Sequence, residues 1–174
     1  DIQFIINGAV KECGLLVLLN KYIENETGSS PFGKNFNVRE APKTEKEIIN
    51  LCTSKIKKHE MPLLVGVGDT VTSTWSKESN QWLRGGSDRG FLTLIQKLGE
   101  IYNLDNKIIF VNSNNEEVRR PSISPNSMKG ISDPNDTLKF DAVMMDGPSE
   151  YIDWFAKLAE IRSSNINNSI NIDY

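Results

Sequence analysis

The chain has 174 residues, of which 38% are hydrophobic and 25% are charged, the balance of a folded globular protein with enough chain for one ordinary domain. A formal net charge of −3 and the shortness of the basic runs exclude broad electrostatic binding to nucleic acid. No apolar run approaches the ~20 residues that a membrane-spanning helix needs, so we expect no membrane partner.

The cysteines indicate the redox environment, and the first residue bears on whether the chain is part of a longer protein. Cys13 and Cys52 show no Cys-x-x-Cys spacing, which disfavours a disulfide framework or a zinc site and favours buried, reduced thiols in the cytoplasm. The chain begins at Asp1 rather than at a methionine, inside an apolar segment with a structured pattern. We therefore expect it to be a portion of a longer protein.

The first third of the sequence is predicted to be mainly helical. Apolar residues recur at helical spacing within residues 8–26, and this periodicity predicts a helix with a core face formed by Val10, Leu15, Leu18, Leu19 and Tyr22. Gly, Pro, Ser and Asn then predominate in a predicted loop over residues 27–43. Thr44 is a predicted N-cap with Glu47 as its capping-box partner, so a second helix is expected over residues 44–58.

From residue 62 onward, short apolar runs alternate with amphipathic segments. The pattern predicts strands at residues 62–67, 107–113 and 140–145, and helices at residues 88–102 and 148–162. The first of these strands is expected to lead into a loop before the helix at residues 88–102. Apolar runs that are this short and continuous are typical of buried parallel strands covered by helices, so the predicted fold class is α/β. The last residues, 163–174, are polar and rich in Asn, which predicts a disordered tail.

Asp69 directly follows the first predicted strand, in the stretch "PLLVGVGDTVTSTW". Ligands of open α/β sheets bind beyond the carboxyl ends of the strands, and Gly66 and Gly68 leave room for a close approach there. We expect Asp69 to end a central parallel strand, with the hydroxyls of Thr70 and Ser73 available to phosphate oxygens. A carboxylate among oxygen donors suits Mg²⁺. An Asx turn that merely ends the strand is the alternative, and residue type alone favours it slightly.

A second cluster, "LRGGSDRGF", precedes the predicted helix 88–102. Such a helix start presents free N–H groups and a positive dipole end to an anion, so Ser87 and the guanidinium of Arg84 or Arg89 are candidate phosphate ligands. Asp88 is a candidate acid of the same site, although capping is the commoner role of an Asp at this position. The sequence contains neither a P-loop nor a complete dinucleotide-binding G-x-G-x-x-G motif.

Three strings together, "LLVGVGDTVTS", "RGGSDRGFLTLIQKLG" and "IIFVNSNNEEVRRPSI", resemble the cyanobacterial glucosylglycerol-phosphate phosphatases, a salt-tolerance family of the haloacid dehalogenase superfamily. The resemblance covers most of the chain, from about "SPFGKNF" to "AKLAEIR". It implies part of a Rossmann-like haloacid dehalogenase core. It also implies a Mg²⁺-dependent phosphatase that converts glucosylglycerol phosphate, a small sugar phosphate, to glucosylglycerol during compatible-solute synthesis under salt stress.

The superfamily pattern implies roles for individual residues. Asp69 matches the first metal-binding acid of the fourth motif, but the usual second acid, four residues later, is Ser73 in this chain. Asp88 is therefore the substitute candidate for completing the metal site. The third-motif lysine precedes this strand by one helix, which makes Lys43 or Lys46 the matching catalytic position. A lysine there would neutralise phosphate charge, although each is equally well explained as a solvated residue near a helix start.

The nucleophile of the superfamily, the first Asp of a D-x-D-G motif, has no match. The nearest string is "FDAVMMDGPSEY", where Met144 occupies the nucleophile position, so Asp146 and Gly147 are predicted to form a turn and helix cap. The resemblance thus implies an aspartyl-phosphate intermediate formed on an N-terminal half outside this chain. It divides the chain into the end of a cap region or a connecting helix (1–30), the C-terminal half of the core (31–162) and a tail (163–174).

Two other functional classes remain open at this point. A non-catalytic α/β module that binds a sugar phosphate or nucleotide would use the "GVGDT" and "GGSDRG" stretches as anion-binding loops. A purely structural or regulatory domain is the third class, because capping alone explains Asp69 and Asp88.

Overall fold

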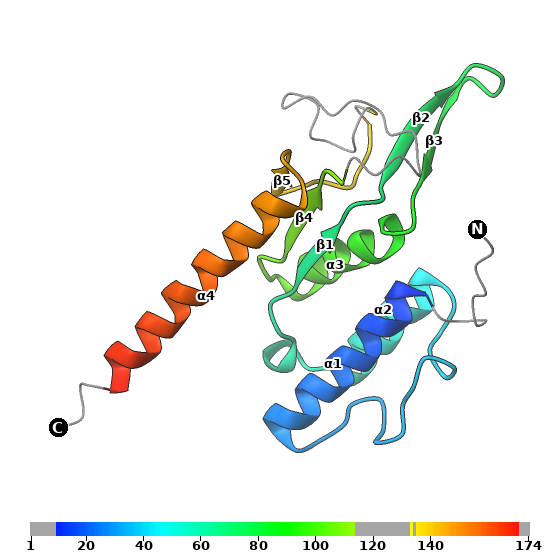
Figure 1. Ribbon diagram of the computed structural model, residues 1–174. Helices are drawn as coiled ribbons and strands as arrows, with labels where there is room; N and C mark the ends of the chain where they lie inside the picture. Colours follow the sequence, from blue (N-terminus) through cyan, green and yellow to red (C-terminus); the bar gives the residue numbers. More distant parts are fainter. Residues whose placement is uncertain (1–9, 114–132, 134, 171–174) are drawn as a thin grey trace.

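A computed structural model describes residues 10–113, 133 and 135–170 (Figure 1). The described elements, in chain order, are α1 (Lys11–Thr27), α2 (Glu45–Lys55), η1 (Lys58–Glu60), β1 (Val65–Gly68), β2 (Thr72–Ser76), β3 (Gln81–Gly85), α3 (Arg89–Tyr102), β4 (Lys107–Val111), β5 (Ala142–Met144) and α4 (Pro148–Ile170). The strands at residues 62–67, 107–113 and 140–145 and the helices before and between them are thus confirmed, with bounds that differ by a few residues.

The three expected strands form one parallel sheet in the order β1-β4-β5. Val65 pairs with Lys107, and Ile109 pairs with Ala142. The predicted α/β class with a parallel sheet is confirmed, in agreement with part of a Rossmann-like core. The expectation that Asp69 follows a central strand is wrong for the described sheet, because β4 is central and β1 lies at the edge.

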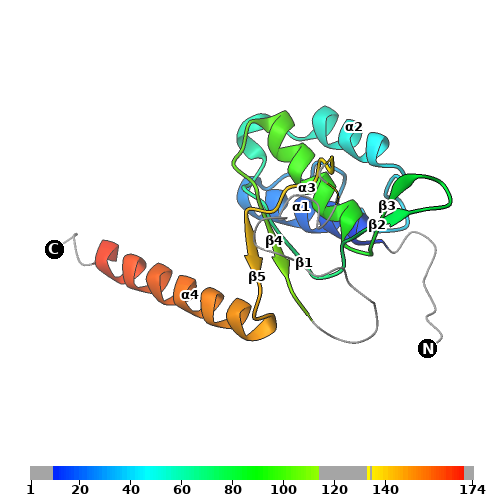
Figure 2. The same cartoon turned by 90° about the horizontal axis from the view of Figure 1, so that it is seen from above.

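Helices cover both faces of this sheet (Figure 2). On one face α3 lies very close to β1, since a β-carbon on Gly66 would come within 2.8 Å of the Leu92 side chain. On the other face Val67 and Ile109 pack with Tyr151 of α4. The sheet is therefore the middle layer, with α1, α2 and α3 on one side and α4 on the other.

The buried face of α1 differs from the one that its periodicity predicted. The buried residues of α1 are Cys13, Leu16, Leu19, Asn20 and Ile23. Of the predicted core residues Leu19 is buried, but Val10, Leu18 and Tyr22 are exposed, Leu18 by 67%. The helix carries two neighbouring apolar stripes, and the described residues cover only one of them.

The local signals for α2 and for the thiols are confirmed. Thr44 and Glu47 form the predicted capping box, with the Glu47 N–H donating to Thr44 Oγ1 at 3.3 Å and the Thr44 N–H donating to Glu47 Oε2 at 3.2 Å. Cys13 and Cys52 are buried free thiols. Burial raises the pKa of Cys52 to about 12, so this thiol stays protonated at neutral pH.

Two elements differ from the sequence prediction. The segment between β1 and α3, expected to be a loop, contains the antiparallel hairpin β2–β3, which projects from the body of the molecule (Figure 1). Helix α4 runs to Ile170, so residues 163–170 of the expected disordered tail are helical. Extending an existing helix costs far less than starting one, which lets the polar segment continue it.

None of the described helices combines the length and hydropathy that crossing a membrane requires.

Candidate functional site

A cavity of about 370 Å³ lies at the carboxyl ends of β1 and β4. This is the position expected for a ligand site in a parallel α/β sheet. Its lining residues come from both strand ends and from the starts of three helices: Lys11, Val67, Gly68, Asp69, Asp88, Val111, Ser113, Pro148 and Tyr151. Asp69 and Asp88, predicted from separate motifs, thus line the same cavity.

Asp88 is the most constrained group of this cavity. Its carboxylate is buried, and Oδ2 accepts the backbone N–H groups of Asp69 and Thr70, both at 2.9 Å. Oδ1 accepts the ammonium of Lys11, which forms an ion pair with it. Asp88 occupies the N-cap position of α3 but makes no side-chain cap hydrogen bond, so the capping interpretation is wrong. Its carboxylate instead connects α1 to the end of β1.

Gly68 permits this connection. A β-carbon at position 68 would lie 2.8 Å from Cβ of Asp88 and 2.9 Å from Cδ1 of Leu92, which is closer than carbon atoms approach. The glycine that precedes Asp69 is therefore required by the close packing of α3 on β1, as the sequence pattern indicated.

Asp69 is held by hydroxyl groups from two strand ends. Its Oδ1 accepts the hydroxyl of Thr70 at 2.8 Å, and its Oδ2 accepts the hydroxyl of Ser113 at 2.6 Å. Ser113 is buried and lies two residues after the end of β4. Ser113 was not among the residues predicted from the sequence, although its place after a strand parallel to β1 is a signal that points to it.

The structure brings a different lysine to the cavity from the two that were predicted. Lys43 and Lys46 are exposed and do not line the cavity. Lys11, in the first turn of α1, lines it and pairs with Asp88. Helix α2 is the α-helix that immediately precedes β1 in the sequence, but the helix whose lysine lines the cavity is α1.

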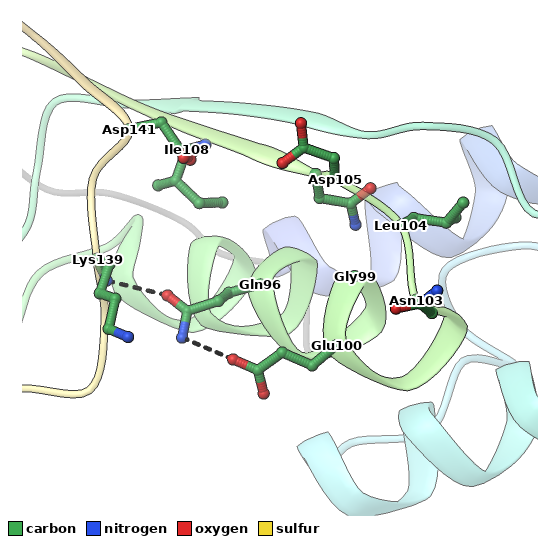
Figure 3. A pocket seen from close by; sticks show the side chains of 10 residues that line it. Gln96, Gly99, Glu100, Asn103, Leu104, Asp105, Ile108, Lys139 and Asp141 are labelled. Carbon is green, nitrogen blue, oxygen red and sulfur yellow. Dashed lines mark hydrogen bonds between the residues drawn. The ribbon is translucent and has the colours of Figure 1, made fainter.

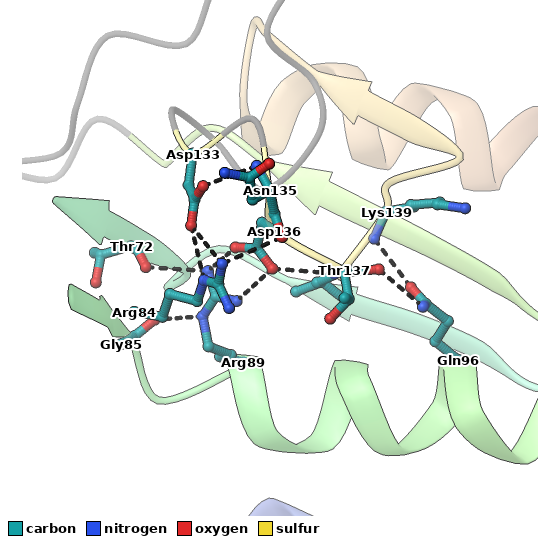
Figure 4. Close-up of polar contacts among 11 residues, drawn as sticks. Thr72, Arg84, Gly85, Arg89, Gln96, Asp133, Asn135, Asp136, Thr137 and Lys139 are labelled. Carbon is teal, nitrogen blue, oxygen red and sulfur yellow. Dashed lines mark hydrogen bonds and ion pairs between the residues drawn. The ribbon is translucent and has the colours of Figure 1, made fainter. Parts of the chain in front are cut away.

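The predicted phosphate ligands on the second cluster have structural partners instead (Figure 4). Arg89 donates to both carboxylate oxygens of Asp136, at 3.0 and 2.7 Å, and to the backbone oxygens of Gly85 and Thr72. Arg84 donates to Asp133 at 2.8 Å. Both guanidinium groups thus hold Asp133 and Asp136 against the hairpin.

The remaining predicted ligands also lie outside the cavity lining. Ser87 is exposed, and Ser73 is buried within β2 with its hydroxyl unpartnered among the described residues. Of the five predicted phosphate ligands, only Thr70 contacts the Asp69–Asp88 cluster.

The contacts of Asp133 lower the pKa of its carboxyl group. Burial raises the pKa of Asp133, but the hydrogen bonds from the Asn135 N–H and from Arg84 outweigh burial and hold that pKa below its usual value. Asp133 is therefore a stable anion at neutral pH, as a structural partner of an arginine should be.

A second cavity, of about 470 Å³, lies at the opposite end of β4 (Figure 3). Two of its polar side chains, Gln96 and Asp141, are engaged in structural hydrogen bonds. Gln96 donates to the backbone oxygen of Thr137 at 3.0 Å and accepts the Lys139 N–H at 2.9 Å, and Asp141 accepts the Ile108 N–H at 2.7 Å. These contacts give this cavity a structural explanation, so the cluster at the carboxyl end remains the candidate site.

Sequence comparison places this architecture in a family. The family model described as glucosylglycerol-phosphate phosphatase matches residues 1–159. The chain belongs to the glucosylglycerol-phosphate phosphatase family. A curated member of that family, the glucosylglycerol-phosphate phosphatase of Synechocystis sp., is 36% identical over 173 residues, covering 93% of this chain and 41% of the relative. The chain thus spans about two-fifths of this family member's length. No solved structure matches the chain.

Proposed function

We propose that the full-length protein is a phosphatase that hydrolyses glucosylglycerol phosphate to glucosylglycerol, in the cytoplasm, as a step of compatible-solute synthesis under salt stress. Residues 31–162 would form the C-terminal half of its core. The observation that carries the proposal is the cluster of Lys11, Asp69 and Asp88 around one cavity at the carboxyl end of β1, in a chain of this phosphatase family.

Lys11 is the proposed phosphate-neutralising residue of this cluster. Its side chain is 52% exposed, so it is accessible to a ligand in the cavity while it pairs with Asp88. Because phosphoryl transfer develops charge on the phosphate oxygens, a fixed cation beside the phosphate lowers the barrier. Asp88 acts through Lys11 as a positioning residue, and Thr70 adds a hydroxyl to the same cluster, where it donates to Asp69.

Asp69 is the proposed metal ligand. Its carboxylate lines the cavity, and the hydroxyls of Thr70 and Ser113 fix its orientation. The Asp88 carboxylate is committed to two N–H groups and Lys11, which argues against the metal role predicted for it. The described residues contain no group of three His, Cys, Asp or Glu side chains able to hold an ion. A single carboxylate still fits Mg²⁺, which keeps several waters and would neutralise phosphate charge when bound.

The attacking carboxylate is proposed to lie outside this chain. Asp146, the acid in the nearest D-x-D-G-like string, is exposed in the turn before α4 and does not line the cavity. The chain would then supply the metal ligand and the cation, while the remainder of the protein supplies the nucleophile.

Phosphate release by the purified full-length protein tests the proposal. We expect inorganic phosphate to be released from glucosylglycerol phosphate in the presence of Mg²⁺ and not after chelation with EDTA. Saturable binding of the sugar phosphate without phosphate release would contradict the proposal and identify a non-catalytic binding module.

A further inference from the structure

The first turn of α1 lies on the first turn of α3 at two points. The Lys11 ammonium pairs with Asp88, the N-cap residue of α3. The Glu12 carboxylate lies against Gly90, the second residue of α3: a β-carbon at position 90 would overlap Glu12 Oε1 and lie 3.1 Å from the carboxyl carbon. Two adjacent residues of α1 thus contact two residues of α3 that are only two positions apart.

The contact with Glu12 depends on glycine at position 90. Any other residue would place its β-carbon where the Glu12 carboxylate lies. Gly90 is not among the described glycines with a positive φ, so its backbone conformation does not require glycine. Glycine within a helix costs stability relative to alanine. The space that Gly90 leaves for Glu12 is therefore the physical reason for a glycine in the first turn of α3.

The start of α3 also attracts a carboxylate electrostatically. The first N–H groups of a helix have no intrahelical acceptor and form the positive end of its dipole. The Asp88 carboxylate makes no side-chain cap bond to these groups, because it binds the N–H groups of Asp69 and Thr70. Glu12, from a different helix, therefore supplies the negative charge beside the first turn of α3.

We propose that Glu12 is a positioning residue for Lys11. Successive residues of an α-helix point about 100° apart, so a Glu12 side chain held against Gly90 fixes the rotation of α1 about its own axis. That rotation sets the direction in which Lys11 points. The Lys11 side chain is 52% exposed, so its pairing with Asp88 alone leaves it room to move. The action of Lys11 on a phosphate rests on the proposed function, whereas the packing of Glu12 on Gly90 does not.

Gly90→Ala in the full-length protein tests this role without removing a charge. The added methyl group displaces the Glu12 carboxylate, which is the end of a flexible side chain and can move away, and alanine favours the helix. We expect kcat for glucosylglycerol phosphate to fall by about 10–100-fold, because a small misplacement of a catalytic group is enough for such a loss. The melting temperature should stay near that of the wild type.

Gly14→Ala is the matched control for this variant. Gly14 lies in α1, and no atom lies within 4 Å of a β-carbon placed there, so this variant should keep wild-type kcat. Wild-type kcat in Gly90→Ala would overturn the proposal. So would a loss of kcat that is accompanied by unfolding of the protein at the assay temperature.

A double-mutant cycle shows whether Gly90 acts through Glu12. We expect Glu12→Ala to lower kcat about as much as Gly90→Ala, and the double variant to be no worse than either, because both changes remove the same contact. Losses that multiply in the double variant would mean that the two residues act independently, which would overturn the proposal. Glu26→Ala, which alters an exposed glutamate at the other end of α1, is the control and should keep wild-type kcat.

Acetylation of Lys11 gives a readout that does not depend on phosphatase activity. An ammonium held by a carboxylate is less available to an acetylating reagent. We therefore expect Lys11 to be acetylated several-fold faster in Gly90→Ala and Glu12→Ala than in the wild type, as measured by mass spectrometry. Equal rates in all three proteins would overturn the positioning role. Absent phosphate release by the wild type, together with faster acetylation in the variants, would contradict only the proposed function.

Discussion

At the scale of single residues, the Asp88 carboxylate connects α1 to the end of β1, two elements that are far apart in the sequence. A buried anion is costly unless charged and polar donors surround it. Here two backbone N–H groups and the Lys11 ammonium supply them. Because one of these donors is a half-exposed cation, the same contacts that stabilise Asp88 also place a positive charge at the cavity.

If the proposed function holds, Lys11→Met in the full-length protein is expected to lower kcat by about 10²-fold, because one electrostatic contact to the transition state is lost. Lys43→Met and Lys46→Met are the comparison, since the sequence analysis assigned the catalytic lysine to one of these exposed positions. Steady-state phosphate release measures all three. A large loss of kcat in Lys43→Met or Lys46→Met, with near-normal turnover in Lys11→Met, would assign the catalytic lysine to α2 or to the loop before it.

Gly68→Ala is expected to destabilise the protein by about 1–3 kcal/mol, because the added methyl group overlaps Asp88 and Leu92 in a packed interface. Gly14→Ala is the matched control. No atom lies within 4 Å of a β-carbon there, so alanine should stabilise helix α1 by about 0.5–1 kcal/mol. Urea unfolding of both variants checks the pair, and equal stability of Gly68→Ala and wild type would contradict the close packing of α3 on β1.

At the scale of elements, the hairpin and the segment before β5 depend on buried ion pairs. Asp136→Asn removes the partner of Arg89, whose side chain is only 15% exposed, so we expect a loss of about 3–5 kcal/mol. Asp105→Asn breaks the Lys107 pair, where Asp105 is 84% exposed, and should cost no more than about 1 kcal/mol. Denaturant unfolding separates the two cases. Similar losses would mean that Arg89 does not hold this segment.

The lowered pKa of Asp133 makes the Arg84 contact dependent on pH. A carboxylate whose native pKa is depressed stabilises the fold above its unfolded pKa, about 4, and this stabilisation is lost as pH falls through the native pKa. The difference in melting temperature between wild type and Arg84→Met should therefore be largest at neutral pH and shrink in acid. A difference that stays constant from pH 7 to about pH 3 would refute this electrostatic role.

The elements that the sequence predicted correctly carry strong local signals. Thr44 and Glu47 mark a helix start by their own hydrogen bonds, and the run Ile108–Val111 is continuous and apolar, as a buried central strand requires. The hairpin was not predicted because Gly, Ser and Thr in this stretch resemble a loop. Its stability comes from cross-strand pairing, such as Trp75 with Trp82 at 5.6 Å between ring centroids, which one strand alone does not reveal.

The candidate site was predictable only in part, for the same reason. Asp69 follows a strand directly, so strand polarity alone places it at the ligand-binding edge. Lys11 lies at the cavity because α1 packs on α3. Arg89 does not lie there, because it binds Asp136, which is 47 residues further along the chain. Such long-range contacts determine which of several charged residues serves a site, and no local pattern encodes them.

At the scale of the whole molecule, the described part is a three-layer core with an open side. An apolar groove formed by α1 and residues 62–65 lies beside β1. Helix α4 extends beyond the sheet, with Ile152 and Ile161 exposed by 62% and 58% (Figure 1). The cavity with Asp69 lies at the carboxyl end of the same open edge. The exposed stripe of α1 that the sequence analysis assigned to the core belongs to this open side, which explains both its apolar character and its exposure.

The dependence of kcat on Mg²⁺ concentration in Asp69→Asn tests the central claim, that the carboxyl end of β1 is a metal-dependent phosphatase site. In the full-length protein we expect kcat to fall by about 10²–10³-fold with an unchanged melting temperature, because an amide keeps the shape of the carboxylate but not its charge. Asp146→Asn, an exposed acid outside the cavity, is the matched control and should retain wild-type turnover. Wild-type kcat and metal dependence in Asp69→Asn would contradict the account and leave Asp69 as a residue that only ends its strand.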